Sequence, residues 1–348
     1  MEKKNKIRVL FLANIPQIDK RSVGGATMLS KKILDFLQKK DEILVKHYQF
    51  RRNWRPKFQI VDFFILIVKL PFIIRKYEVV SIHSTPDMNL TIGPILAKTA
   101  KIFNKKVVYH FFGGNFYEQY ISAPKFVRWV VDNTTFKSNY VFFETKQLMR
   151  VFSDMGGTDL IWLPNSRKKI LDRMPDRSYN KKFVFISRVI KEKGIDTILE
   201  AFDKLDDSYN LSIYGPIPPN KYTIRDLTKR NCFYNGILTE EEVLEVLMEN
   251  DVLLLPTYFD GEGYPGIIIE ALSVGMPVIA SNWKAINEII SSGHNGLLCA
   301  PKDSNSLLKR ILELNNENYL QLSKNAWASF EGFDAERVFN KLLLSYLN

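Results

Sequence analysis

Residues 251–281, DVLLLPTYFDGEGYPGIIIEALSVGMPVIAS, indicate a strand, a turn, a helix and a second strand. DVLLLP and PVIAS are short apolar runs bounded by turn residues, which is typical of buried strands. Between them, Pro265 suits the first helical position, because the N–H that proline lacks has no intrahelical acceptor there. Gly275 suits the position just past the helix end, where a positive φ costs little. The sequence therefore predicts a helix from about residue 265 to about residue 274, between two strands.

Two carboxylates in this stretch need an explanation. Glu262 lies in the glycine turn before the helix, and Glu270 lies one turn inside it. The N-terminal end of a helix favours anions such as phosphate. Glu262 would repel a bare phosphate, so it needs neutral donors such as sugar hydroxyls. A ligand with a phosphate flanked by hydroxyl-bearing groups, such as a nucleotide sugar, would suit both glutamates and the helix end. The alternative is a solvated turn followed by a helix residue that faces solvent.

The same turn contains a G-x-G-x-x-G pattern, formed by Gly261, Gly263 and Gly266, which is typical of dinucleotide-binding proteins. Three features argue against a nicotinamide or flavin enzyme. An acid lies where the pyrophosphate would bind, and the next strand ends in Ser281-Asn282 without an acid for the ribose. The turn also follows several earlier strands of its half, whereas the fingerprint normally follows the first strand.

Short apolar runs alternate with amphipathic stretches along the whole chain, which predicts an α/β protein with parallel sheets. The expected strands are IRVLFLA, EVVSIHS, KVVYHFF and NYVFFET in the first half, and KFVFISR, LSIYG, CFYNG, DVLLLP and PVIAS in the second. Ligands of such sheets bind beyond the carboxyl ends of the strands. Two sheets facing one another would enclose a cleft lined by the loops that follow the strands.

The length of 348 residues allows two domains with sizeable cores. A Pro-Asn-Ser turn in LPNSRKK suggests a boundary, with an N-terminal domain at 1–165 and a C-terminal domain at 166–348. AERVFNKLLLSYLN predicts a terminal helix at about 334–348, which could pack back on the N-terminal domain. Residues 1–165 contain 27 Lys and Arg and 13 Asp and Glu, a net charge of +14, whereas the remainder has a net charge of −3.

The sequence offers no sign of a disulfide framework, a zinc cluster or a signal peptide. Its two cysteines, Cys232 and Cys299, favour a reducing, cytoplasmic location. The apolar segment 58–74 contains Asp62, Lys69 and Pro71, so we expect a buried or surface-lying helix rather than a membrane span. There is no D-x-D motif, and the four histidines are scattered, so we expect no metal and no other cofactor.

The spacing Glu262-x7-Glu270 resembles the signature of the family 4 retaining glycosyltransferases, which have the GT-B fold of two facing Rossmann-like domains with an interdomain cleft. The segment FISRVIKEKGID looks like the family element whose cations bind the donor diphosphate, here Arg188 and Lys193. The resemblance implies that Glu262 holds hydroxyls of the transferred sugar and that Glu270 holds the nucleotide ribose. The two cations and the helix end would stabilise the departing diphosphate.

Other segments agree with the resemblance. SVGGATMLSKKILDFL resembles the family's glycine loop, which implies that Gly25 lies near the donor phosphate. VVYHFFGG matches the strand that ends in the active-site histidine, here His110, which would orient the sugar. NGIL at 235–238 falls where the family contacts the base through its backbone, here at Ile237. The family commonly has a third glycine where this chain has Pro265, so the phosphate should contact the amides of Gly266 and Ile267.

The resemblance implies a retaining, metal-independent hexosyltransferase that uses a nucleotide-diphosphate sugar and a glycan or lipid-linked acceptor, in surface polysaccharide or glycolipid biosynthesis. A nucleotide-sugar epimerase and a catalytically silent binding protein of the same fold are the alternatives. The basic N-terminal half, with clusters such as RRNWRPK at 51–57, suggests peripheral association with the anionic inner face of the cell membrane. Such charge would also suit a nucleic acid, but no recognition motif accompanies it.

Overall fold

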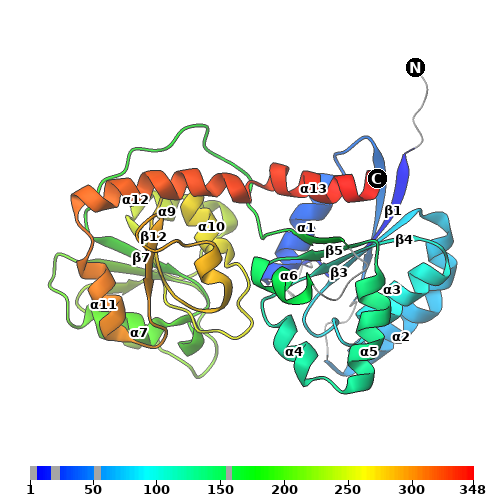
Figure 1. Cartoon of the computed structure of the whole chain (residues 1–348). Helices are drawn as coiled ribbons and strands as arrows, with labels where there is room; N and C mark the ends of the chain where they lie inside the picture. Colours follow the sequence, from blue (N-terminus) through cyan, green and yellow to red (C-terminus); the bar gives the residue numbers. More distant parts are fainter. Residues whose placement is uncertain (1–5, 17–23, 51–55, 154–158) are drawn as a thin grey trace. The chain divides into compact units, whose positions relative to one another are not determined.

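The computed structural model describes residues 6–16, 24–50, 56–153 and 159–348, and Figure 1 shows its elements. The basic stretch 51–57 lies outside the residues whose side chains are described. Contacts divide the chain into two compact units, one comprising Met1–Asn165 with Glu336–Asn348 and the other comprising Ser166–Ala335. Each unit has its own sheet and its own core.

The first unit contains a six-stranded parallel sheet in the order β2-β1-β3-β4-β5-β6. Its strands are β1 (Ile7–Ala13), β2 (Ile43–Gln49), β3 (Val79–Ser84), β4 (Lys106–Phe111), β5 (Tyr140–Phe143) and β6 (Asp159–Trp162). Its helices are α1 (Gly25–Leu37), α2 (Pro56–Ile73), α3 (Ile92–Ile102), α4 (Phe116–Ser122), α5 (Lys125–Thr134), α6 (Lys146–Phe152) and α13 (Ala335–Leu347), with 3₁₀ turns η1 (Ile74–Lys76) and η2 (Thr135–Lys137).

Successive side chains of a strand point to opposite faces of the sheet, so every second residue packs into the same core. Leu10, Ile82 and Tyr109 face a cluster that includes buried residues of α2, α3 and α5. Side chains one position along the same strands face the opposite side of the sheet. There the Ser81 hydroxyl lies 2.8 Å from the hydroxyl of Tyr346 on α13, so this terminal helix packs within the first unit.

Helix α2 confirms the expectation of a helix over the apolar segment, and part of it is exposed. Leu66 and Leu70 are buried in the core of the first unit. Ile60, Phe64 and Phe72 are each more than 60% exposed. Within the described ranges, no helix combines the length and the apolar character that crossing a bilayer requires.

The second unit contains a six-stranded parallel sheet in the order β12-β11-β10-β7-β8-β9. Its strands are β7 (Lys182–Ile186), β8 (Asn210–Tyr214), β9 (Cys232–Tyr234), β10 (Val252–Leu255), β11 (Val278–Ser281) and β12 (Gly296–Cys299). Its helices are α7 (Ile195–Phe202), α8 (Ile224–Leu227), α9 (Glu240–Glu249), α10 (Gly266–Ser273), α11 (Ser304–Leu312) and α12 (Asn316–Ser329), with 3₁₀ turns η4 (Lys191–Lys193), η5 (Lys284–Glu288) and η6 (Phe330–Phe333).

Local chemistry explains where the helices of this unit begin and end. The Thr239 hydroxyl accepts from the Glu242 amide at 3.3 Å, and the Glu242 carboxylate accepts from the Thr239 amide at 2.7 Å, which closes a capping box at the start of α9. Gly275 has a φ of 66° just after α10, as its place in the sequence predicts. Pro265 is the residue before α10 rather than its first residue.

All nine predicted strands are present, and the described residues contain three further strands that the sequence did not reveal. These are β2, β6 and β12, each of which lies at an edge of its sheet. An edge strand pairs on one side only, so its sequence carries a weaker strand signal than that of a central strand.

Candidate active site

The candidate site lies in the second unit, where the direction of strand order reverses. Strand β7 lies between β10 and β8, so successive strands proceed outward in both directions from β7 and β10. The loops that follow β7 and β10 therefore lie side by side at the carboxyl edge of the sheet. The Tyr258 amide donates to the Glu192 carbonyl at 2.8 Å, which joins the two loops directly.

A buried ion pair links these two loops. The Lys193 ammonium, in the loop after β7, lies 2.6 Å from Oε2 of Glu262, in the loop after β10. Both residues are less than 10% exposed. The Thr257 hydroxyl donates to the same oxygen at 2.8 Å. The donors that Glu262 finds within the protein are thus a cation and a hydroxyl, rather than neutral groups alone as the sequence suggested.

Phe259 brings the two predicted cations together. The Arg188 guanidinium carbon lies 5.2 Å from the centre of the Phe259 ring, and the Lys193 ammonium lies 5.1 Å from it. Both distances are within the range of cation–π contacts. Lys193 is buried and paired, whereas Arg188 is exposed to solvent. The structure therefore places one fixed cation and one accessible cation around a single aromatic ring.

The N-terminus of α10 follows the same loop. Pro265 precedes the helix, and the Ile268 amide donates to the Pro265 carbonyl at 3.1 Å. Within the described part of the chain, the amides of Gly266 and Ile267 donate no hydrogen bond. Unpaired amides at a helix N-terminus can bind an anion. This arrangement is compatible with the predicted phosphate contact at these two residues.

Glu270 lies one turn into α10 and has a partner that the sequence did not reveal. Its Oε1 accepts a charged hydrogen bond from Nε of Arg167, and both side chains are partly buried. The Arg167 Nη1 also donates to the Ser166 carbonyl at 2.9 Å. The ribose-binding role of Glu270 stays a prediction.

Two predicted donor-binding residues lie at loop or helix ends. Ile237 follows β9 and is 66% exposed, and the preceding Gly236 accepts from the Gly215 amide at 2.8 Å. Gly25 belongs to the first unit, where it is the first residue of α1 and is exposed. A β-carbon built on Gly25 would meet no described atom within 4 Å. Their roles at the nucleotide base and the phosphate stay predictions.

His110, which VVYHFFGG suggested as the active-site histidine, lies deep within the first unit. His110 lies inside β4 and is fully buried, and neither ring nitrogen has a hydrogen-bond partner in the described structure. It is in register with His83 and Phe142 on the neighbouring strands. Burial lowers the pKa of His110 to about 3. The ring is enclosed among core residues, and its role in orienting a sugar stays a prediction.

Three residues of the site were missed in the sequence. Thr257 and Phe259 directly follow the predicted strand DVLLLP, so the rule that parallel strands bind ligands at their carboxyl ends could have identified them. Arg167 lies in LPNSRKK, which the sequence identified only as a domain boundary. No local pattern pairs Arg167 with Glu270, because 103 positions separate them.

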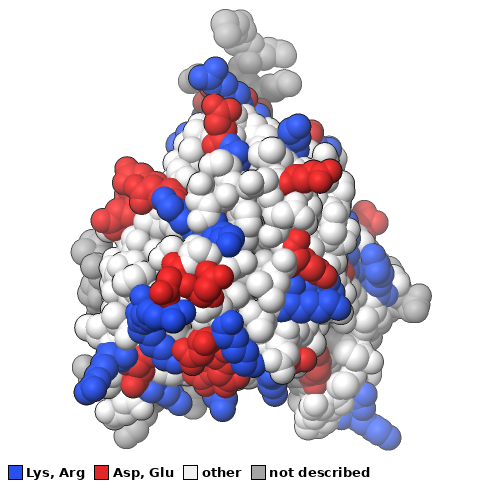
Figure 2. Space-filling model, turned by 90° about the vertical axis from the view of Figure 1, so that its left-hand side faces the viewer, with Lys and Arg blue, Asp and Glu red and all other residues white. Residues whose placement is uncertain are grey.

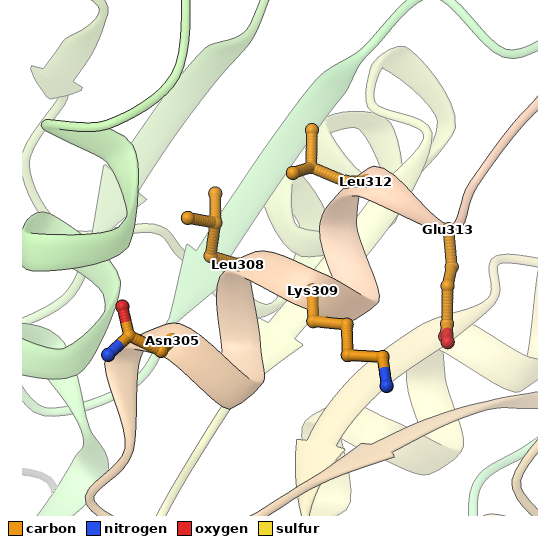
Figure 3. A pocket seen from close by; sticks show the side chains of 5 residues that line it. All are labelled: Asn305, Leu308, Lys309, Leu312 and Glu313. Carbon is orange, nitrogen blue, oxygen red and sulfur yellow. The ribbon is translucent and has the colours of Figure 1, made fainter.

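The rest of the described surface offers little further chemistry. In the described part of the chain, no three His, Cys, Asp or Glu side chains form a group that could hold a metal ion. The hollow in Figure 3 is lined by α11 through Asn305, Leu308, Lys309 and Leu312, and by Glu313 just after it, and it contains no predicted site residue. On the face drawn in Figure 2, charges of both signs intermingle. Neither feature indicates a second ligand site.

The carboxy-terminal part of the chain matches a known family. Residues 167–328 match the family described as "Glycosyl transferases group 1". N,N'-diacetylbacillosaminyl-diphospho-undecaprenol alpha-1,3-N-acetylgalactosaminyltransferase of Campylobacter jejuni is 23% identical over 325 residues, which cover 86% of this chain and 84% of that protein. The amylovoran biosynthesis glycosyltransferase AmsK of Erwinia amylovora is 31% identical over 144 residues, which cover 38% of this chain and 35% of AmsK. The chain likewise spans only 33% and 40% of relatives from Bacillus subtilis and Klebsiella pneumoniae.

Solved structures share the fold along nearly the whole chain. The Anabaena protein HepE in complex with UDP has a TM-score of 0.74 at 15% identity and covers 97% of this chain and 99% of its own. Sucrose-phosphate synthase from Thermosynechococcus elongatus has a TM-score of 0.75 at 14% identity and covers 98% of both chains. These likenesses confirm the predicted α/β class, with two Rossmann-like parallel-sheet units of the GT-B type.

Proposed function

Since residues 167–328 match the group 1 glycosyl transferase family and the chain has the GT-B fold, we propose that the whole chain is a glycosyltransferase. It moves a sugar from a nucleotide-diphosphate sugar to a glycan or lipid-linked acceptor. The observation that carries this proposal is the buried Lys193–Glu262 pair, which joins the loops after β7 and β10 beside the unpaired amides of α10. A site with cations, amides and carboxylates can hold a diphosphate and hydroxyl groups together.

The proposed chemistry assigns one task to each group. Arg188, Lys193 and the amides of Gly266 and Ile267 stabilise the negative charge that grows on the departing diphosphate. Glu262 accepts hydrogen bonds from the transferred sugar through Oε1, since Lys193 and Thr257 bind Oε2. These groups stabilise the leaving group without a metal. By the resemblance of its glutamate spacing, the reaction retains the configuration of the transferred sugar.

The acceptor is proposed from the relatives. The Campylobacter relative is named for transfer to a diphospho-undecaprenol-linked sugar, and AmsK is named for amylovoran biosynthesis. An acceptor of this kind is a growing glycan or a sugar on a lipid diphosphate. We therefore place the chain in surface polysaccharide or glycolipid biosynthesis.

The test combines binding and transfer. UDP-, GDP- and ADP-sugars are screened for thermal stabilisation of the purified chain, because a bound donor raises stability by mass action. The stabilising donor is then incubated with a synthetic lipid-diphosphate sugar in EDTA. We expect a product whose new linkage has the donor's anomeric configuration by NMR. A free sugar would show an epimerase or a hydrolase instead, and restoration by magnesium or manganese would overturn metal independence.

We also propose that the first unit binds an anionic membrane. Ile60, Phe64, Val68 and Phe72 recur every four residues along α2, and all four are more than half exposed. They form one apolar stripe, because residues four apart lie on the same face of a helix. Lys69 belongs to the same helix, and Arg75 and Lys76 follow it in η1. An apolar stripe beside cations suits a shallow position in an anionic lipid surface.

Vesicle sedimentation tests this association. We expect binding to vesicles that contain anionic lipid, weaker binding in high salt, and a loss of binding in a Phe64→Ser/Phe72→Ser variant. Leu320→Ser, which changes an exposed leucine of α12, is the matched control and should bind normally. Equal binding of the wild type to neutral vesicles, or none to either kind, would contradict the proposal.

A further inference from the structure

The proposed donor site contains an arginine with no assigned role. Arg167 is fixed at its backbone, because its amide donates to the Phe333 carbonyl at 3.0 Å and its carbonyl accepts from the Ala335 amide at 2.9 Å. Its side chain extends to α10, where Nε donates to Oε1 of Glu270. Both groups belong to the second unit, so this geometry does not depend on the placement of the first.

The guanidinium lies directly against the start of α10. A β-carbon built on Gly266 would lie 2.7 Å from Cζ of Arg167 and 3.3 Å from its Nη1, and it would also collide with Nη2. The first of these distances is shorter than real β-carbon contacts allow. Glycine at position 266 therefore leaves the space that the guanidinium occupies, beside the unpaired amides of Gly266 and Ile267.

This location is electrostatically unfavourable for a cation alone. The N-terminus of a helix carries partial positive charge, so it repels a guanidinium. Glu270 compensates for this repulsion through the charged hydrogen bond from Nε. A phosphate at the two amides would compensate for it more fully, because arginine presents several donors in one plane that match phosphate oxygens.

We propose that Arg167 is a further donor-binding residue, whose guanidinium binds a phosphate of the nucleoside diphosphate at the N-terminus of α10. This inference rests on the proposed function and adds a third cation to Arg188 and Lys193. While the phosphate contacts Nη groups, Nε keeps Glu270 in place for the ribose hydroxyls. Arg167 thus makes the site select ligands that carry a phosphate over the bare nucleoside.

The experiment compares a nucleoside diphosphate with its own nucleoside. UDP, GDP and ADP are titrated calorimetrically against the wild type, and the one that binds is compared with its nucleoside by NMR titration. In Arg167→Gln we expect the diphosphate to bind about tenfold more weakly or worse, as for a lost charged hydrogen bond. The nucleoside should lose much less affinity, because Glu270 is still present although its partner is gone. Arg167→Lys should fall in between. The ratio of the two affinities within one variant is independent of the fraction folded.

Gly266→Ala provides an independent arm. In the otherwise wild-type chain, the added methyl group should displace the guanidinium and weaken diphosphate binding. In the Arg167→Gln background the same change should have little further effect, because the shorter side chain leaves room. Arg310→Gln is the matched control, since it breaks an arginine–glutamate pair at the C-terminal end of α11, outside the proposed site.

The outcomes distinguish a failure of the phosphate contact from a failure of the proposed function. Equal weakening of diphosphate and nucleoside in Arg167→Gln would show that Arg167 only holds Glu270, and it would overturn the phosphate contact. Unchanged diphosphate binding in Arg167→Gln, or an equal effect of Gly266→Ala in both backgrounds, would also overturn it while the proposed function stands. A wild-type chain that binds none of the three diphosphates would overturn the proposed function and this inference together.

Discussion

Single residues show most clearly how burial changes the meaning of a motif. His110 follows the pattern of a strand that ends in a functional histidine, yet its ring lies 4.2 Å from the Phe112 ring and 5.5 Å from the His83 ring, measured between ring centres. Its neighbours at the same level of the sheet are apolar or neutral. A charged imidazole would lose its hydration there, so both histidines are held neutral.

This burial predicts a dependence of stability on pH. Burial lowers the pKa of His110 to about 3, and burial together with the nearby histidines lowers the pKa of His83, whereas both have a value of 6.5 in model compounds. Below pH 6.5 the unfolded chain binds protons that the folded chain does not, so the free energy of unfolding should fall as the pH drops toward 3. In His110→Phe the slope of this fall should be smaller. Urea denaturation at several pH values between 7.5 and 4.5 measures it.

His294→Gln is the control for this prediction, because His294 is exposed on the second unit. It should leave the slope as in the wild type. An unchanged slope in His110→Phe would mean that His110 is hydrated or charged in the folded state, which would contradict its burial.

At the scale of elements, short connections bring the site together. Lys193 ends η4, and Gly194 joins it to α7 with a φ of 85°. A β-carbon on Gly194 would lie 2.8 Å from both the carbonyl carbon and Cγ of Pro256, which follows β10. The close approach of this turn to Pro256 helps to hold Lys193 opposite Glu262.

A pair of glycine variants separates the cost of the left-handed backbone at Gly194 from the cost of the collision with Pro256. Gly194→Ala should lower the free energy of unfolding by about 1 kcal/mol for the left-handed backbone, and by roughly 1–3 kcal/mol more for the collision with Pro256. Gly236→Ala has a similar φ of 92° and open space around it, so it should show only the first loss. Urea denaturation of both variants measures the difference. Equal losses would show that the turn can move away from Pro256.

The elements also show which strands a sequence reveals. Central strands such as β7 and β10 are covered on both faces and consist almost wholly of apolar residues. The missed strand β2 lies at an edge of its sheet, and Leu44 and Lys46, which share one face, are both exposed. Apolar continuity predicts a central strand well, but an edge strand is defined by its pairing with the rest of the sheet.

At the scale of the whole molecule, the chain leaves the first unit at residue 165 and returns to it at residue 336. Helix α13 contributes buried Leu342 and Tyr346 to the first unit, although more than 160 residues of the second unit precede it. The first unit therefore includes a helix that follows the whole second unit in the sequence.

Because α13 packs within the first unit, a truncated core residue of α13 should destabilise that unit alone. Leu342→Ala should destabilise the first unit by about 2–5 kcal/mol, as expected for a truncated buried leucine. Hydrogen exchange followed by mass spectrometry should show faster exchange in β1 and β3 and unchanged exchange in β7 and β8. Leu344→Ala removes the same atoms from a leucine that is 54% exposed on the same helix and should change neither. Faster exchange throughout the second unit would contradict the division into two units.

The sequence by itself determined the alternation of strands and helices, the helix of residues 266–273 with its flanking strands, and the loops that hold Arg188, Lys193 and Glu262. These features follow from local periodicity and from the conformational preferences of proline and glycine. Only the tertiary structure decided that Lys193 pairs with Glu262 across 69 positions and Arg167 with Glu270 across 103, and that His110 belongs to the core. The Lys193–Glu262 pair depends on β7 lying beside β10, and the Arg167–Glu270 pair depends on the segment at Arg167 packing beside α10. The burial of His110 depends on the strands beside β4. A local sequence pattern specifies none of these neighbours.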